Sequence, residues 1–233
     1  MRRIIATIIF ILCLPFLVLS LLLIYLIFII ASLFGEGFKR KVSTAIYFSW
    51  GRLAVYSTLS RITVVGRERL PYGKPMVIYS NHASFFDIPI LSGFVIPSAT
   101  YAARKGLAIS PIIVASGGVL LDRKSSRSEL KNIREIVRRI KAGRPFIIFP
   151  EGTRSHSDEI GDLKSGSIKI AQWAKAYAVP VRIEGTRDLL PRGAYWPKPA
   201  EVRVVIGEPF SPDDMLNGEI LSKMKSFFEN DTD

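Results

Sequence analysis

The chain has few of the residues that the commonest catalytic and metal sites require. Its single cysteine, Cys13, allows no intramolecular disulfide and no cysteine-based zinc site. Histidine occurs only twice, as His82 and His156. The sequence also lacks the Gly-x-x-x-x-Gly-Lys phosphate loop, the Gly-x-Ser-x-Gly elbow of serine hydrolases and the His-Glu-x-x-His motif of zinc proteases. These absences argue against nucleotide hydrolysis, serine hydrolysis and zinc proteolysis.

Charged residues are also absent from a long N-terminal stretch, residues 4–34, in which Leu, Ile, Phe and Val dominate. The stretch exceeds the roughly 20 residues that a helix needs to cross a bilayer, and the apolar core of about 7–15 residues in a secretory signal. We therefore predict a permanent membrane anchor, with a cleaved signal as the alternative. Basic residues flank it on both sides, so the positive-inside rule leaves open a spanning helix or a helix that enters one leaflet and returns.

A second helix is expected after a glycine-containing turn at residues 35–37, because apolar residues such as Ile46 and Trp50 recur at helical spacing. Basic ends and an aromatic body suit a helix at the membrane interface, and packing on the globular part is the alternative. We predict that residues 1–60 form the membrane-anchoring helices and residues 61–233 form one globular domain.

Positive charge predominates in the chain, with 32 Lys and Arg against 20 Asp and Glu and a net charge of +12. Such a balance attracts nucleic acid, anionic lipid head groups or phosphorylated ligands. Because a membrane segment is present, we expect membrane lipids and phosphorylated ligands as partners, and no nucleic acid.

Short apolar runs alternate with longer helical patterns from residue 61 onward. This alternation predicts an α/β fold, a layered sheet covered by flanking helices, attached to the N-terminal hydrophobic helices. The predicted strands are 62–65, 76–79, 100–103, 119–121, 146–149, 179–183 and 202–206. The predicted helices are 85–94, 126–142, 164–177 and 212–228.

The first polar cluster is Asn-His-Ala-Ser-Phe-Phe-Asp at residues 81–87, directly after an apolar run. A neutral imidazole held by a carboxylate can take a proton from a hydroxyl near pH 7. Five positions are about 140° apart on a helix, so His82 and Asp87 can meet only if His82 lies in a loop and Asp87 in the first helical turn. The alternative is that Ser84 and Asp87 form a capping box and His82 is an ordinary loop residue.

Arg123 follows the predicted strand 119–121 as part of an Asp-Arg pair. Its planar guanidinium could bind a phosphate, and a surface ion pair with the adjacent aspartate is the alternative.

Another polar cluster follows the predicted strand 146–149, where ligand sites of α/β sheets gather. Glu151 could orient an arginine or bind a ligand hydroxyl, and Gly152 lets the backbone approach a ligand. Thr153 offers a hydroxyl and Arg154 a guanidinium. Lys164, at the start of a predicted helix, is a further possible anion ligand. A plain polar turn is the alternative.

Together these clusters resemble the glycerolipid acyltransferase family, specifically the 1-acylglycerol-3-phosphate acyltransferases. Four blocks match in order. They are Asn-His-x-x-x-x-Asp at 81–87, an apolar strand ending in Asp-Arg at 118–123, Phe-Pro-Glu-Gly-Thr-Arg-Ser at 149–155, and Val-Pro-Val at 179–181. Any one block is a weak signal, but four in order are a strong one.

The resemblance implies acyl transfer from acyl-coenzyme A or acyl carrier protein to the sn-2 hydroxyl of lysophosphatidic acid, giving phosphatidic acid. His82 would be the general base and Asp87 would hold its tautomer. Arg123, Glu151, Gly152, Thr153, Arg154 and Lys164 would bind the substrate. No cofactor and no metal are expected, since a thioester is already activated. We expect the protein at the cytoplasmic face of a membrane, the inner membrane in a bacterium.

Two other functions stay open. The first is acyl transfer to a different lysolipid, either another lysophospholipid or an amino-acid lysolipid. The second is a non-enzymatic basic membrane protein that binds anionic partners without chemistry, in which case changing His82 would have no effect.

Overall fold

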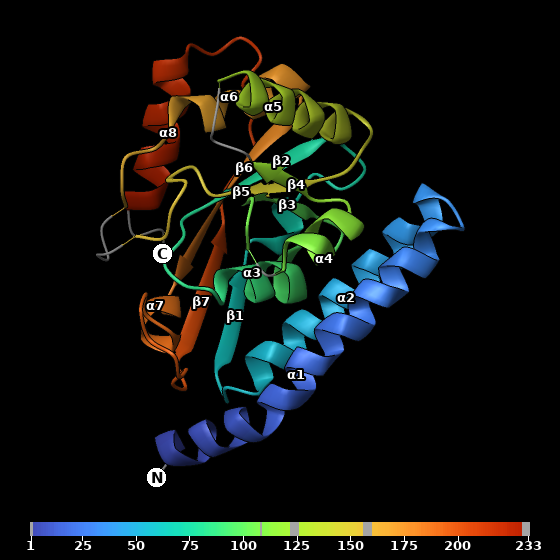
Figure 1. The fold of residues 1–233 in the computed structure, drawn as a ribbon. Helices are drawn as coiled ribbons and strands as arrows, with labels where there is room; N and C mark the ends of the chain where they lie inside the picture. The colour runs from blue at the N-terminus through green and yellow to red at the C-terminus, as the bar shows by residue number, and fades with distance from the viewer. Residues whose placement is uncertain (1, 108, 122–125, 156–159, 230–233) are drawn as a thin grey trace.

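A computed structural model describes residues 2–107, 109–121, 126–155 and 160–229. Its seven strands form one sheet in the order β1-β7-β6-β2-β5-β3-β4 (Figure 1). Neighbouring strands pair in parallel, except that β6 and β7 are antiparallel. The strands are β1 (Arg61–Val65), β2 (Met76–Ser80), β3 (Thr100–Arg104), β4 (Val119–Leu121), β5 (Phe146–Ile148), β6 (Tyr177–Glu184) and β7 (Glu201–Ile206). All seven predicted strands are present, within two residues at either end.

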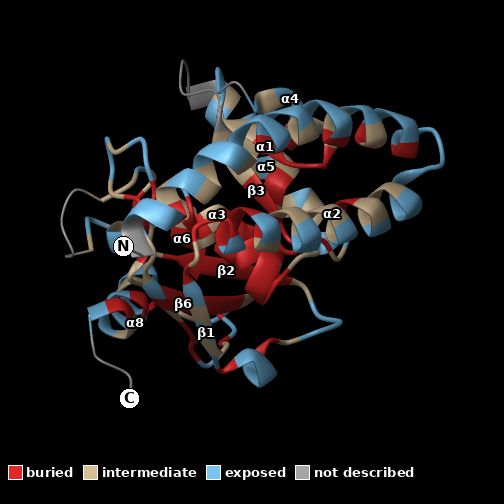
Figure 2. Ribbon diagram, turned by 90° about the horizontal axis from the view of Figure 1, so that it is seen from below, coloured by how far each residue is buried: buried red, intermediate tan, exposed pale blue. Residues whose placement is uncertain are grey.

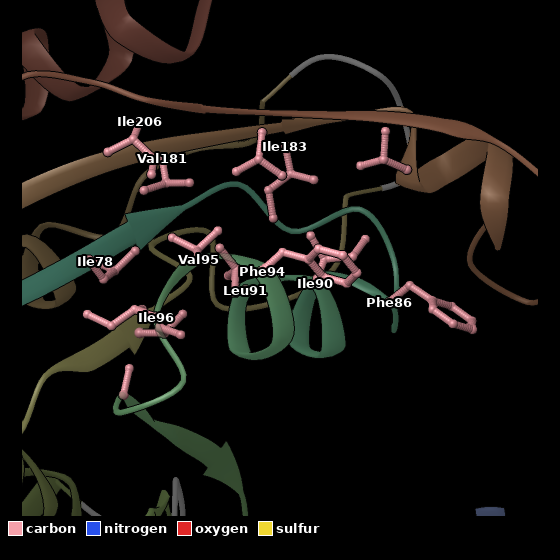
Figure 3. Close-up of a cluster of buried hydrophobic side chains, with 14 of the residues drawn as sticks. Ile78, Phe86, Ile90, Leu91, Phe94, Val95, Ile96, Val181, Ile183 and Ile206 are labelled. Atoms are coloured by element: carbon pink, nitrogen blue, oxygen red, sulfur yellow. The ribbon is translucent and has the colours of Figure 1, made fainter. Parts of the chain in front are cut away.

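Alternation along β2 explains how the sheet builds two cores, since successive side chains of a strand point to opposite faces. Ile78 joins one cluster of buried apolar side chains, which includes Ile90, Leu91 and Val181 (Figure 3). Val77 and Tyr79 join a second cluster on the other face. Every residue of β2 is buried, as expected for a central strand covered on both sides.

Helices cover both faces of the sheet (Figure 1). The first cluster contains residues of α2 (Glu36–Tyr56), α3 (Asp87–Ile90) and η2 (Leu91–Val95), which is a π-helical turn. The second contains residues of α5 (Ser126–Lys141), α6 (Ser165–Ala174) and α8 (Asn217–Glu229). The remaining short helices are α4 (Ser110–Ala115), α7 (Thr186–Leu189) and the 3-10 turn η1 (Arg67–Arg69). The predicted layered α/β fold is therefore confirmed.

Several predicted helices differ in extent from the observed ones. The predicted helix 85–94 is a short α-helix followed by a π-helical turn. The predicted helix 164–177 ends at Ala174, because Lys175 adopts the left-handed conformation with φ of 51°. The predicted helix 212–228 begins only at Asn217. The sequence did not predict α4 and α7, because elements of six and four residues are too short to show a periodic pattern.

An N-terminal helical hairpin runs along the face of the domain that carries α3 and α4 (Figure 1). Its first helix, α1 (Arg2–Ser32), is long and apolar enough to cross a membrane, with a mean hydropathy of 3.0 over Ile4–Ser32. Most of its large apolar side chains are exposed (Figure 2). An exposed apolar surface of this size suits a lipid environment. The predicted apolar N-terminal helix is therefore present.

The second helix of the hairpin, α2, packs on both α1 and the globular part. The indole nitrogen of Trp50 donates to the hydroxyl of Ser20 at 3.0 Å, which joins α2 to α1. On its other side α2 contacts α3 and η2, and Arg52 Nε donates to the carbonyl oxygen of Gly93 at 3.0 Å. The division of the chain at residue 60 stays a prediction.

Two glycines allow α2 to approach the globular part closely. A Cβ added at Gly51 would lie 2.6 Å from the carbonyl oxygen of Pro89 and 2.8 Å from the backbone nitrogen of Gly93. A Cβ added at Gly93 would in turn lie 2.9 Å from the backbone of Gly51. Because backbone atoms fill the space on both sides, neither position accommodates a larger residue.

We therefore expect Gly51→Ala to destabilise the protein. Overpacking of a tight contact costs about 1–3 kcal/mol, and chemical denaturation of the detergent-solubilised protein followed by circular dichroism would measure the loss. Gly37→Ala is the matched control on the same helix, because a Cβ there meets no atom within 4 Å. Equal stability of the two variants would contradict the close packing of α2.

Candidate active site

His82 and Asp87 meet at the carboxyl end of β2. The strand ends at Ser80 and α3 begins at Asp87, so His82 lies in the connecting loop. Its ring nitrogen Nδ1 is 2.7 Å from Oδ2 of Asp87, whose side chain is fully buried. Since Asp87 faces Nδ1, the opposite ring nitrogen, Nε2, is left for the hydroxyl of a substrate.

One half of the Ser84–Asp87 capping box occurs together with the imidazole–carboxylate pair. Oδ2 of Asp87 also accepts hydrogen bonds from the backbone N–H groups of Ala83 and Ser84, both at 2.8 Å. The hydroxyl of Ser84 accepts from the backbone N–H of Phe86 at 3.2 Å. The same carboxylate therefore begins the helix and holds the imidazole, which fixes the five-residue spacing between them.

Residues of other strands hold the loop of His82 in place. The side chain of Asn81 bridges to β6, donating to the carbonyl oxygen of Ile183 at 2.8 Å and accepting from its N–H at 2.7 Å. The ring of Phe149, which follows β5, stacks on the imidazole with ring centroids 4.0 Å apart. Neither contact was predicted, although Asn81 and Phe149 lie inside the motifs that were noted.

Glu151 is joined to the main chain of His82. Its Oε1 accepts from the backbone N–H of His82 at 2.9 Å, and its Oε2 accepts from the N–H of Gly161 at 3.3 Å. The backbone N–H of Ser155 donates to the carbonyl oxygen of His82 at 2.8 Å. Burial raises the pKa of Glu151 above its ordinary value. Both carboxylate oxygens thus face backbone donors, a geometry that positions His82, while a substrate contact of Glu151 stays a prediction.

Arg154 contacts the loop of His82 through its side chain. Its guanidinium carbon is 3.7 Å from the ring centroid of Phe85, which is a cation–π contact. Burial, and then the positive charge of Arg192, lower the pKa of Arg154, while the charge of Asp87 opposes the shift. A cationic group therefore lies beside the imidazole–carboxylate pair.

The other predicted binding residues are arranged around Gly152. This glycine has a φ of 73°, and a Cβ there would lie 2.6 Å from Nζ of Lys164. Lys164 precedes α6, and its backbone N–H donates to the carbonyl oxygen of Pro150 at 2.9 Å. Thr153 is exposed. Arg123 and His156 lie outside the described residues, as does the rest of the polar stretch at 156–159.

The site therefore brings together His82, Asp87, Glu151 and Arg154 from two segments that are far apart in the sequence. Gly152 and Lys164 form an adjoining pair. Within the described part of the chain, no three His, Cys, Asp or Glu side chains are close enough together to hold a metal ion.

A model of the Acyltransferase family matches residues 61–184, more than half of the chain. The chain belongs to the acyltransferase family. The matched segment includes both halves of the site, the loop at residues 81–87 and the cluster at 151–154.

Individual relatives have more specific names than the family. The chain is 31% identical over 197 residues to the chloroplastic 1-acyl-sn-glycerol-3-phosphate acyltransferase LPAT1 of Arabidopsis thaliana, covering 81% of this chain and 55% of the relative. It is 30% identical over 173 residues to 1-acyl-sn-glycerol-3-phosphate acyltransferase of Pseudomonas aeruginosa, covering 68% of this chain and 64% of the relative. The chain thus spans little more than half the length of LPAT1.

A solved structure resembles the whole chain. It is the 1-acyl-sn-glycerophosphate acyltransferase PlsC of Thermotoga maritima, which is 27% identical and superimposes with a TM-score of 0.77. The superposition covers 97% of this chain and 94% of that structure, so the likeness includes the N-terminal hairpin as well as the α/β domain.

The contacts of Glu151 generate a prediction for Glu151→Gln. An amide keeps one acceptor but presents its NH₂ group to a backbone donor, so the loop of His82 shifts. Misplacement of a catalytic group by about 1 Å can cost about a hundredfold in rate. We expect kcat for acyl transfer to fall about ten- to a hundredfold, with an unchanged KM for the acceptor. Glu68→Gln, on the exposed turn η1, is the control. A raised KM with normal kcat would show instead that Glu151 binds the acceptor.

Proposed function

We propose that the protein transfers a fatty acyl group from a thioester to the sn-2 hydroxyl of 1-acyl-glycerol-3-phosphate, giving phosphatidic acid. The observation that carries the proposal is the contact of 2.7 Å between His82 and Asp87, in a loop whose Phe85 ring packs against the guanidinium of Arg154. It combines a base for a hydroxyl with a cation for a phosphate. The names of the relatives support the same acceptor.

Acyl transfer needs one base to remove the proton of the acceptor hydroxyl, and a site that holds the thioester carbonyl in place. Nε2 of His82 removes the proton of the acceptor hydroxyl as the oxygen attacks the thioester carbonyl carbon. The tetrahedral intermediate then expels the thiolate, which takes the proton back from the imidazolium. Asp87 stabilises the imidazolium and keeps Nδ1 protonated. General-base help of this kind contributes about 10²–10⁴ in rate. The thioester is itself activated, so these steps require no cofactor.

Phosphate binding places the hydroxyl against His82. Arg154 supplies a planar fork suited to phosphate oxygens. Directly before Arg154 in the chain come Gly152 and Thr153, and Lys164 lies close to Gly152 in space. Arg123 is a further candidate for binding the phosphate. Fixing one end of the acceptor converts an encounter into an oriented complex, and orientation can supply several kcal/mol.

The anchor brings the enzyme to its substrates. Lysophosphatidic acid and phosphatidic acid reside in the bilayer, so a catalytic domain held at the surface meets its acceptor by a two-dimensional search. The donor is acyl-coenzyme A or acyl carrier protein, and both are anionic and cytosolic. We therefore assign the domain to the cytoplasmic face of a membrane, which in a bacterium is the inner membrane.

The direct test is an assay of the purified protein with lysophosphatidic acid and each donor in turn, with other lysolipids as competing acceptors. We expect phosphatidic acid from the wild type and a loss of about 10²–10⁴ in kcat for His82→Ala, with an unchanged circular dichroism spectrum. His156→Ala removes the only other histidine and is the matched control.

Two outcomes would overturn this assignment. Preferential acylation of another lysolipid would replace the acceptor. A folded His82→Ala protein with most of its activity would remove the proposed base.

A further inference from the structure

A second arginine contacts the site from a segment that no motif covers. Nη1 of Arg192 donates a hydrogen bond to the backbone carbonyl oxygen of Arg154 at 2.9 Å. Arg192 lies in the connection between α7 and β7, beyond residues 61–184 matched by the family model. It is also outside all four blocks noted in the sequence.

The segment of Arg192 is fastened to the loop of His82. The hydroxyl of Ser84 donates to the carbonyl oxygen of Leu190 at 2.8 Å, and both residues are buried. The chain then turns, because the N–H of Ala194 bonds to the carbonyl oxygen of Pro191 at 3.1 Å. Arg192 is therefore held at the loop of His82 by one buried contact, and at Arg154 by its own side chain.

Because the guanidinium of Arg192 lies 2.9 Å from the backbone of Arg154, its charge acts on the Arg154 side chain. The charge of Arg192 is the second cause, after burial, that lowers the pKa of Arg154. Like charges at short distance repel, and a bound anion relieves that repulsion. The planar donor groups of two arginines can match the oxygens of a phosphate, and a doubly charged phosphate gains from both.

We propose that Arg192 and Arg154 together form the subsite for the acceptor's terminal phosphate, and that Arg192 selects a doubly charged phosphate monoester over a singly charged diester. This rests on the proposed function and deepens it. A monoester presents three free oxygens and two charges, enough for both arginines. A diester has one oxygen blocked by its second substituent and carries one charge, so it gains less from the second arginine.

Binding of two short-chain probes tests the subsite without acyl transfer. Octyl phosphate is a monoester, and octyl methyl phosphate is its diester. The Kd of each, measured by titration calorimetry on the detergent-solubilised full chain, should differ in its response to Arg192→Gln. We expect the Kd of the monoester to rise about tenfold and that of the diester by less than about threefold, since a hydrogen bond to a charged group is worth tenfold or more.

Two further variants sharpen the comparison. Arg192→Lys keeps the charge but loses the planar fork, so its monoester Kd should lie between those of the wild type and Arg192→Gln. Arg61→Gln removes an exposed arginine at the start of β1 and should change neither Kd. In the acyl-transfer assay, Arg192→Gln should raise KM for lysophosphatidic acid.

Two results would overturn the inference. An equal rise in both Kd values would mean that Arg192 only supports the loop of Arg154, and unchanged values would mean that it takes no part in binding. Failure of the proposed function looks different, because the wild type would then not acylate lysophosphatidic acid even if it bound octyl phosphate through Arg192.

Discussion

A single buried carboxylate oxygen organises the site. Oδ2 of Asp87 faces the imidazole of His82 and accepts two backbone N–H groups, from Ala83 and Ser84. These three donors belong to consecutive residues, so the loop after β2 wraps around one carboxylate oxygen. Burying a carboxylate is costly without hydrogen-bond donors, and Oδ2 carries them all, since Oδ1 of Asp87 is buried without a partner among the described residues. The start of α3 and the orientation of His82 therefore depend on one another.

The sheet supplies the second constraint. In parallel strands the carboxyl ends lie at the same edge, so the loops after β2 and β5 meet, although His82 and Glu151 are 69 residues apart in the chain. Glu151 and Ser155 use this proximity to bond the main-chain N–H and carbonyl oxygen of His82. Asn81 ties the same loop to β6. The loop of His82 is thus positioned by contacts with β6 and with the loop after β5, and the guanidinium of Arg154 packs on Phe85 of the same loop.

The sequence predicted those parts of the molecule in which a local pattern reflects burial. Apolar runs indicated every strand. The central strand β2 is buried along its whole length, as a covered sheet requires, whereas the edge strand β1 alternates between exposed and partly buried residues. The π-helical turn η2 was missed because it lies where Gly51 and Gly93 bring two segments together, which depends on tertiary contact. The antiparallel pairing of β6 and β7 was also missed, since a strand's direction leaves no trace in its composition.

The candidate site, like the fold, could be predicted only in part. The pairing of His82 with Asp87 could be predicted, because the two meet only if His82 lies in a loop and Asp87 in the first turn of a helix. The link from Glu151 to the backbone of His82 could not be predicted, because a main-chain N–H carries no signal in the sequence. Arg192 could not be predicted either, since the contact between Ser84 and Leu190 that places it joins residues with no shared pattern.

The most direct test of this account is the position of the proton on His82. Nitrogen-15 NMR of histidine-labelled protein, at a pH where the ring is neutral, distinguishes the two tautomers, and His156→Ala assigns the signals. We predict that Nδ1 carries the proton and that Nε2 is unprotonated, with the preference lost in Asp87→Asn. A neutral ring with its proton on Nε2 in the wild type would contradict the account, because His82 could not then accept a proton from a substrate hydroxyl.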